Sequence, residues 1–208
     1  MEAVYHRAVL AEAVGGQVSP RALAAMSAAN VGQDSLRGLL HFAWHFDNSL
    51  FAEGLADMEQ WRAEAAPAAD PATAWAAFGR LSHAAQDFYS HSNSVALWRA
   101  RFAGQAAPPV DSIDGLDGAL LKEPRLKSGR VYLPWEALAL VAALRPLAKR
   151  LLPRDAHAWM NLDRPDTGPL FAYSLVAARQ RTRAEFDRTL AAIGEAQGEA
   201  AMRAFRDL

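Results

Sequence analysis

Histidine and aspartate recur at one-turn spacing in the middle of the chain. His83, Asp87 and His91 are each four residues apart, so in a helix they share one face. A separate apolar stripe runs beside them, made of Leu81, Ala84, Ala85 and Phe88. The polar face therefore borders the expected core, where side chains of facing helices can converge on a metal ion. From spacing alone, a solvated helix face with two histidines is an equal interpretation.

A second pair of histidines, His41 and His45, lies in an apolar stretch with Asp47. Burying these groups is costly without partners, and a metal or a carboxylate would satisfy them. For His41 we favour a hydrogen-bonded core residue. His157 ranks below the others as a ligand, because position 161, four residues later, holds an asparagine instead of a carboxylate.

The elements that must position these residues are predicted to be helices. Alanine, leucine and arginine dominate, and alternating β-branched runs are missing from the sequence. Helices are expected over 2–14, from Pro20 behind a Ser19 cap, over 34–46 with a break near Asn48, and over 51–65. Further helices are expected from Asp70-Pro71 past His91 to about 102, over 134–152, and over the end of the chain with a break near Gly194 or Gly198. The stretches 104–133 and 153–169 are expected to be irregular, and the first suggests a lid. An all-α multi-helix bundle follows.

Composition narrows the class of protein. The 208 residues suit one domain, and 51% hydrophobic residues are typical of a globular chain. The net charge of −1 gives no global argument for nucleic acid, and without cysteine any metal must be held by His, Asp, Glu or backbone groups. No window of about 18 uncharged apolar residues predicts a membrane span. The first residues do not resemble a signal peptide, so we expect a cytoplasmic protein, with secretion or delivery to other cells as alternatives.

The segment Gly79–Asn93, read Gly-Arg-Leu-Ser-His-Ala-Ala-Gln-Asp-Phe-Tyr-Ser-His-Ser-Asn, resembles the central motif of the Het-C family. That family includes fungal heterokaryon-incompatibility proteins, animal relatives with von Willebrand factor A domains, and bacterial members. Asp34 followed by His45-Phe46-Asp47-Asn48 is similar to its upstream segment, and Asn161-Leu162-Asp163 is similar to a later one. The family in turn is similar to the zinc-dependent phospholipases C and the fungal single-strand nucleases, which are all-helical and bind three zinc ions.

The resemblance implies an ordered set of metal ligands, although His6 by itself would more often be structural. The six matching residues are His6, Asp34, His45, His83, Asp87 and His91. Asp87 would bridge two ions, and Asp34 would also act as a base. Those enzymes complete the last site with a histidine and a carboxylate one turn later, and use the amine of the mature N-terminus. Here His157 with Asn161 departs from that pattern, and Met1 lies five residues before His6.

The implied activity for a single domain over 1–208 is metal-dependent phosphodiester hydrolysis. Two or three Zn²⁺ ions, with Mn²⁺ or iron as alternatives, would lower the pKa of a water that attacks the phosphorus. We expect a phospholipase C-type reaction on a phospholipid, with peripheral membrane contact, giving diacylglycerol and a phosphorylated head group. A single-strand nuclease is the first alternative, for which Trp44, Trp61, Trp75 and Trp98 are available as stacking surfaces, although nucleic acid is less favoured by the charge. A non-catalytic membrane-active or interaction protein with a partial metal site is the second.

Overall fold

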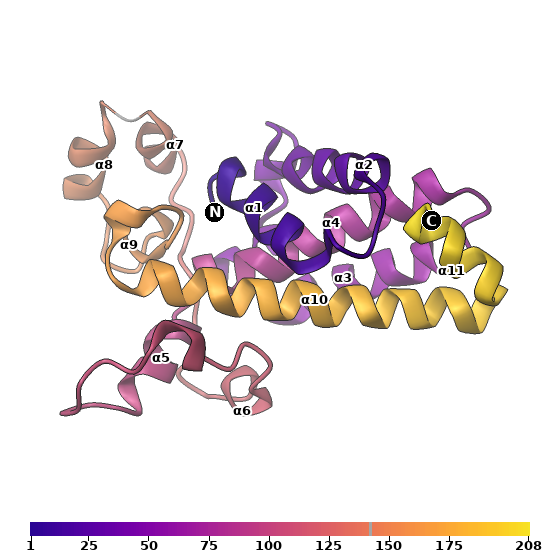
Figure 1. Cartoon of the computed structure of the whole chain (residues 1–208). Helices are drawn as coiled ribbons and strands as arrows, with labels where there is room; N and C mark the ends of the chain where they lie inside the picture. The colour runs from indigo at the N-terminus through magenta and orange to yellow at the C-terminus, as the bar shows by residue number, and fades with distance from the viewer. Residues whose placement is uncertain (142) are drawn as a thin grey trace.

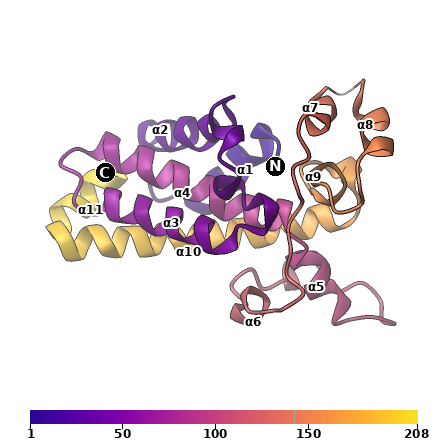
Figure 2. The same cartoon turned by 180° about the vertical axis from the view of Figure 1, so that it is seen from behind.

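The computed structural model describes residues 1–141 and 143–208, and it has an all-α fold as predicted. Within these ranges, β-type pairing is limited to two isolated bridges, Ser92 to Ser128 and Arg130 to Ala156. A bundle of helices extends along the long helix α10, and two smaller excursions project from one end of it (Figure 1). Figure 2, seen from behind, shows the same separation of the excursions from the bundle.

The bundle is formed by six helices: α1 (Ala3–Val14), α2 (Pro20–Val31), α3 (Phe51–Ala65), α4 (Pro71–His91), α10 (Leu170–Gln197) and α11 (Glu199–Arg206). Helix α4 is central, because it packs against α2, α3 and α10 and because every residue from Leu81 to Ser92 is buried. The excursions contain α5 (Ser94–Ala100) and α6 (Gly118–Leu121) on one side, and α7 (Trp135–Leu140), α8 (Arg145–Leu151) and α9 (His157–Met160) on the other.

Two of the predicted helix starts are confirmed by their caps. Ser19 Oγ accepts a hydrogen bond from the backbone N–H of Ala22 at 3.1 Å, and Pro20 begins α2. Asp70 Oδ1 accepts from the N–H of Thr73 at 3.0 Å, and Pro71 begins α4. The predicted break at Gly198 is also confirmed, since this glycine adopts a left-handed φ of 82° between α10 and α11.

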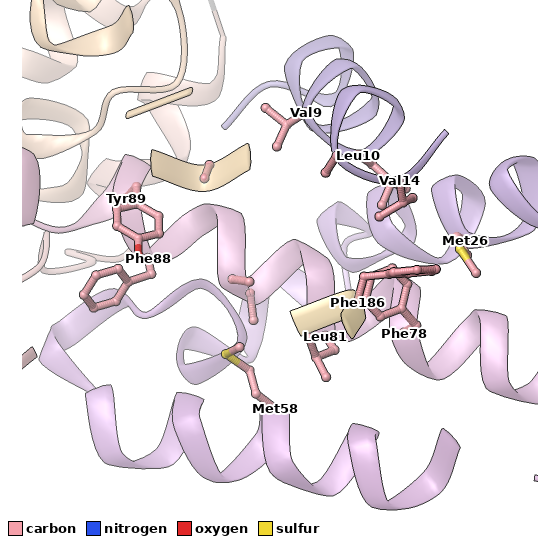
Figure 3. Close-up of a cluster of buried hydrophobic side chains, with 14 of the residues drawn as sticks. Val9, Leu10, Val14, Met26, Met58, Phe78, Leu81, Phe88, Tyr89 and Phe186 are labelled. Carbon is pink, nitrogen blue, oxygen red and sulfur yellow. The ribbon is translucent and has the colours of Figure 1, made fainter. Parts of the chain in front are cut away.

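The main core lies where α4 meets its neighbours, as Figure 3 shows for residues such as Phe78, Leu81 and Phe186. The rings of Phe78 and Phe186 meet edge to face with centroids 5.5 Å apart. Gly79 lets α2 approach α4 closely, because a Cβ there would lie 2.4 Å from the carbonyl oxygen of Met26. A second, small core joins α8 to α9 and consists of Ala148, Leu152, Ala156 and Ala158.

The helix predicted over 34–46 is wrong. The chain instead forms four short 3-10 turns, η1 (Gly32–Asp34), η2 (Gly38–Leu40), η3 (Phe42–His45) and η4 (Asp47–Ser49). A continuous helix would place residues 34 and 45 about 16 Å apart at 1.5 Å per residue. The turns fold the chain back, so that Asp34 Oδ1 lies 4.0 Å from His45 Nδ1. The core position favoured for His41 is also wrong, because its ring is exposed and stacks on Trp44 at 4.0 Å.

Other predicted boundaries shift in smaller ways. The helix expected over 134–152 is divided into α7 and α8, and α4 ends at His91 before α5 begins at Ser94. The stretches 104–133 and 153–169 are largely irregular but contain the short helices α6 and α9. In the described ranges, we find no helix with the length and hydropathy that a membrane crossing requires.

Candidate metal centre

The six residues predicted as ligands come together at one end of α4. His83, Asp87 and His91 project from α4 itself, at the one-turn spacing seen in the sequence. The other three arrive from α1 with His6, from η1 with Asp34 and from η3 with His45. Five of the six side chains are buried, and Asp34 is 33% exposed.

One group of ligand atoms surrounds the Oδ2 side of Asp87. His45 Nδ1 and His83 Nε2 each lie 2.9 Å from Asp87 Oδ2, and His83 Nε2 lies 3.6 Å from Asp34 Oδ1. His6 Nε2 lies 3.3 Å from the other oxygen, Asp87 Oδ1. His6, Asp34, His83 and Asp87 each place one donor atom within 4.8 Å of the others, which is close enough for a shared ion.

A second group contains residues that the sequence analysis did not count as ligands. His157 Nδ1 lies 2.9 Å from Asp47 Oδ1, and His91 Nδ1 lies 3.4 Å from the same oxygen. Asp163 Oδ1 lies 3.1 Å from His91 Nε2, so this side chain stands where the last carboxylate was missing. The acid follows His157 by six residues, beyond the short helix α9, instead of by one helical turn. The only signal for it in the sequence was its place in the Asn161-Leu162-Asp163 segment.

Asp87 connects the two groups. Its Oδ1 also lies 3.7 Å from His91 Nε2 and accepts a hydrogen bond from the Met1 amine at 2.5 Å. That amine lies 3.2 Å from Asp163 Oδ1 and is fully buried. Burial opposes the charge on Asp87, but His91, the Met1 amine and His83 together hold the pKa of this carboxyl well below its usual value.

The donor set and its charges fit divalent ions. Four carboxylates, those of Asp34, Asp47, Asp87 and Asp163, lie within one small region of largely buried side chains. Gathering like charges away from water is unfavourable unless cations compensate them. Within the described part of the chain, the buried His6 Nε2, 3.3 Å from Asp87 Oδ1, has no hydrogen-bond partner, so it retains a lone pair that the protein does not use. Imidazole with carboxylate, without thiolate, is a set that zinc accepts.

The turn that carries His45 and Asp47 is strained. Phe46, Asn48 and Ser49 all have left-handed backbone angles, with φ values of 57°, 56° and 58°. Such angles are costly for residues with a side chain, above all for a bulky one, and persist only where the surroundings enforce them. The segment around Ser128 does so: its hydroxyl donates to the carbonyl of Phe46 and accepts from the N–H of Ser49. The turn thus directs His45 toward Asp87 and Asp47 toward His91 and His157.

A layer of buried amides fixes the ring of His6 from behind. His6 Nδ1 donates to Gln86 Oε1 at 2.5 Å, which leaves Nε2 to face Asp87. Asn30 Nδ2 donates to the same oxygen at 3.3 Å, and Gln86 Nε2 donates to Thr182 Oγ1 at 3.3 Å. Helices α1, α2 and α10 are therefore joined to α4 through one glutamine. This partner for the distal nitrogen is the usual way in which a protein orients a metal-binding imidazole.

Replacing Gln86 with leucine should lower the free energy of unfolding by about 2 kcal/mol, because His6, Asn30 and Thr182 would each lose a buried hydrogen-bond partner. Urea unfolding followed by circular dichroism measures the change. The matched control is Gln60→Leu, since Gln60 is exposed and its side chain donates a hydrogen bond to Glu64 in its own helix. Equal stability of the two variants would show that the amide layer does not hold the helices together.

A pocket opens onto the centre from outside. Its polar lining includes Asp34, His45, Asp47, His91, His157 and Asp163. Its apolar lining includes Leu36, Leu39, Leu40, Phe42, Val131 and Leu133. Within the stretch 104–133, which suggested a lid, Val131 lines this pocket, whereas Leu120 is buried in the main core. Both groups of ligands are thus within reach of a molecule that enters past leucine side chains.

Comparison with known proteins gives one family. A family model described as the VWA7 N-terminal domain matches residues 1–118, which include all six predicted ligands and Asp47. His157 and Asp163 lie beyond the matched region. No curated protein and no solved structure matches the chain. The resemblance to the Het-C family and the zinc phospholipases stays a prediction.

Proposed function

The chain belongs to the family of the VWA7 N-terminal domain, and from its buried centre we propose that it is a zinc-dependent phosphodiester hydrolase that cleaves phospholipids. The observation that carries the proposal is the convergence of five histidines and four carboxylates on two neighbouring groups of donor atoms that share Asp87. A solvated polar helix face would not bury these side chains together.

The residues that would hold the ions follow from the geometry. His6, Asp34, His45, His83 and Asp87 would serve one group, and Asp47, His91, His157 and Asp163 the other. When bound, zinc supplies a Lewis acid for the phosphate oxygens and lowers the pKa of a coordinated water. Asp47 and Asp163 weaken the case for a non-catalytic protein with a partial site, because they provide the carboxylates that this interpretation assumed to be missing.

Asp34 is the best candidate for the base. It is the most exposed carboxylate of the centre at 33%, and it lines the pocket. Burial and the charge of Asp87 raise its pKa, which makes it a better proton acceptor than an ordinary aspartate. Asp34 would take a proton from the attacking water as the new P–O bond forms. The bond from phosphorus to the glycerol oxygen breaks, and that oxygen takes up a proton from solvent water to leave as an alcohol, while Asp34 returns its proton to the solvent.

The pocket favours a lipid over single-stranded nucleic acid. Leucines at positions 36, 39, 40 and 133 form much of its wall, and they suit acyl chains better than stacked bases. Trp61, Trp75 and Trp98, which the nuclease alternative requires on a stacking surface, are buried in the core. Trp44 is partly buried and packs on Trp61, away from the pocket lining.

The substrate test compares phosphatidylcholine in mixed micelles with single-stranded DNA, using zinc-loaded protein. We expect diacylglycerol and phosphocholine from the lipid, and slower or no cleavage of DNA. Asp34→Asn should lower the rate on lipid roughly a hundredfold, because an amide cannot accept the proton. Asp111→Asn, at an exposed aspartate outside the centre, is the matched control and should act like the wild type.

Three results would contradict this proposal in different ways. Cleavage of DNA without cleavage of lipid would identify a nuclease. Release of phosphatidic acid or fatty acid would place the broken bond elsewhere than at the glycerol oxygen. A zinc-loaded protein that is inactive on both substrates would favour the non-catalytic alternative.

A further inference from the structure

Helix α8 exposes two leucine side chains. Leu147 is 53% exposed and Leu151 is 58% exposed, and their spacing of four places them on one face of the helix. The neighbouring face is already used, because Ala148 packs in the small core that joins α8 to α9. A helix with apolar side chains on two faces is usually covered on both. We therefore expect the face of α8 that carries Leu147 and Leu151 to contact another surface.

Exposed apolar residues also surround the mouth of the pocket. Leu36 is 88% exposed and Leu40 is 65% exposed, and both line the pocket. Leu133, which also lines the pocket, is 56% exposed, and Trp135, two residues later, is 54% exposed. Figure 1 shows α7, α8 and the segment that follows α2 at the same upper edge of the molecule. We define the docking face as Leu36, Leu40, Leu133, Trp135, Leu147 and Leu151. Concentrated exposure of this kind marks an interaction site.

The segment 133–154, which supplies four of the six side chains of the docking face, is rich in basic residues. Residues 133–154 contain four basic residues and one acidic residue, Glu136, although the chain as a whole carries a net charge of −1. The basic side chains are those of Arg145, Lys149, Arg150 and Arg154. Protein surfaces that bind to the headgroup region of an anionic bilayer typically combine leucine and tryptophan with arginine and lysine.

We propose that the docking face places the protein on an anionic lipid bilayer with the pocket mouth turned toward the membrane. This inference rests on the proposed phospholipid hydrolase and specifies its partner surface. A lipid could then reach the metal centre past Leu36, Leu40 and Leu133 without its acyl chains crossing water. A second copy of the chain fits this face less well. A twofold dimer would bring the same basic residues of both copies together, and like charges repel.

The test is vesicle flotation with the full chain, treated with chelator so that no lipid is hydrolysed. We expect the wild type to float with vesicles that contain phosphatidylglycerol, and to float less with phosphatidylcholine alone or at high salt. The double variant Leu147→Ser with Leu151→Ser should bind about tenfold more weakly, because it removes two inserted side chains. Leu116→Ser with Leu208→Ser is the matched control, since these leucines are 49% and 76% exposed away from the docking face.

The readouts separate this inference from the proposed function. Dispersed short-chain phosphatidylcholine needs no membrane, and Leu147 and Leu151 lie outside the pocket lining. The double variant should therefore hydrolyse the dispersed lipid at the wild-type rate while losing activity on vesicles. Flotation without any hydrolysis would uphold the docking face and contradict the hydrolase. The docking face would be overturned by a wild type that hydrolyses dispersed lipid but does not float, by unchanged flotation of the double variant, or by a wild-type dimer that this variant dissociates.

Discussion

Replacing Asp87 with asparagine is expected to slow phosphodiester hydrolysis roughly a thousandfold, a loss of about 4 kcal/mol in transition-state stabilisation. Asp87 is the only one of the four carboxylates that contacts donor atoms of both groups: His83 Nε2 lies 2.9 Å away, His6 Nε2 3.3 Å and His91 Nε2 3.7 Å. An amide keeps the shape of the side chain but removes the negative charge. One change should therefore lower zinc content at both groups of ligands.

The measurements are zinc per chain and the rate of lipid hydrolysis at saturating substrate. Asp163→Asn offers a graded comparison, because Asp163 contacts His91 and the Met1 amine but lies outside the first group. We expect it to lose part of the zinc and keep a fold that circular dichroism cannot distinguish from wild type. If Asp87→Asn binds as much zinc as the wild type and hydrolyses lipid as fast, the shared centre is not the site of the reaction.

Zinc should also stabilise the protein against heat, whether or not any substrate is cleaved. An ion that binds only the folded chain adds about 2.7 kcal/mol per site at a hundred times its Kd. For a chain of this length each kcal/mol raises Tm by about 2–4 °C. One occupied site should therefore raise Tm by about 5–10 °C, and a second site should add to it. The four carboxylates make the gain large, since their mutual repulsion is relieved when a cation binds.

Scanning calorimetry measures this shift as the difference in Tm between chelator-treated protein and the same protein after zinc is restored. Magnesium at the same concentration is the matched control for charge, because it prefers oxygen ligands and keeps its waters, so histidines hold it weakly. The Asp87→Asn variant should show a smaller shift with zinc than the wild type. Identical Tm values with and without zinc, and no zinc retained on gel filtration, would mean that the cluster is a hydrogen-bonded polar core.

Local signals in the sequence predicted the helices well and the short turns poorly. Ser19-Pro20 and Asp70-Pro71 are capping patterns whose physics involves only neighbouring residues, and both begin helices in the structure. The apolar spacing over 34–46 suggested a helix. Such spacing contains no information on whether the two ends of a segment must lie close together. Here Asp34 and His45 face the same buried carboxylate, and this tertiary requirement overrides the local pattern.

The residues of the candidate site that lie on one regular helix could be predicted from their spacing, and those on irregular segments could not. His83, Asp87 and His91 follow the helical repeat, so their shared face could be read directly from the spacing. Asp163 was named only as part of a resembling segment, and Asp47 was named beside His41 and His45 and in such a segment, but neither was counted as a ligand. Asp47 follows a residue with a left-handed backbone, and Asp163 follows the short helix α9 in extended chain. The direction of neither side chain can therefore be deduced from a helical repeat in the sequence. A site whose last carboxylate comes from such a segment is recognised only once the chain is folded.

The order in which the ligands occur along the chain bears on how the protein is made. Synthesis proceeds from the N-terminus, so His6 and Asp34 leave the ribosome long before His157 and Asp163. Thr182, which supports the amide layer behind His6, emerges later still. A nascent chain therefore carries several metal-binding side chains without the geometry that unites them. The proposed centre can assemble only after α9 and much of α10 have been synthesised. Any activity toward the lipids of the cell that makes the protein would therefore be delayed until then.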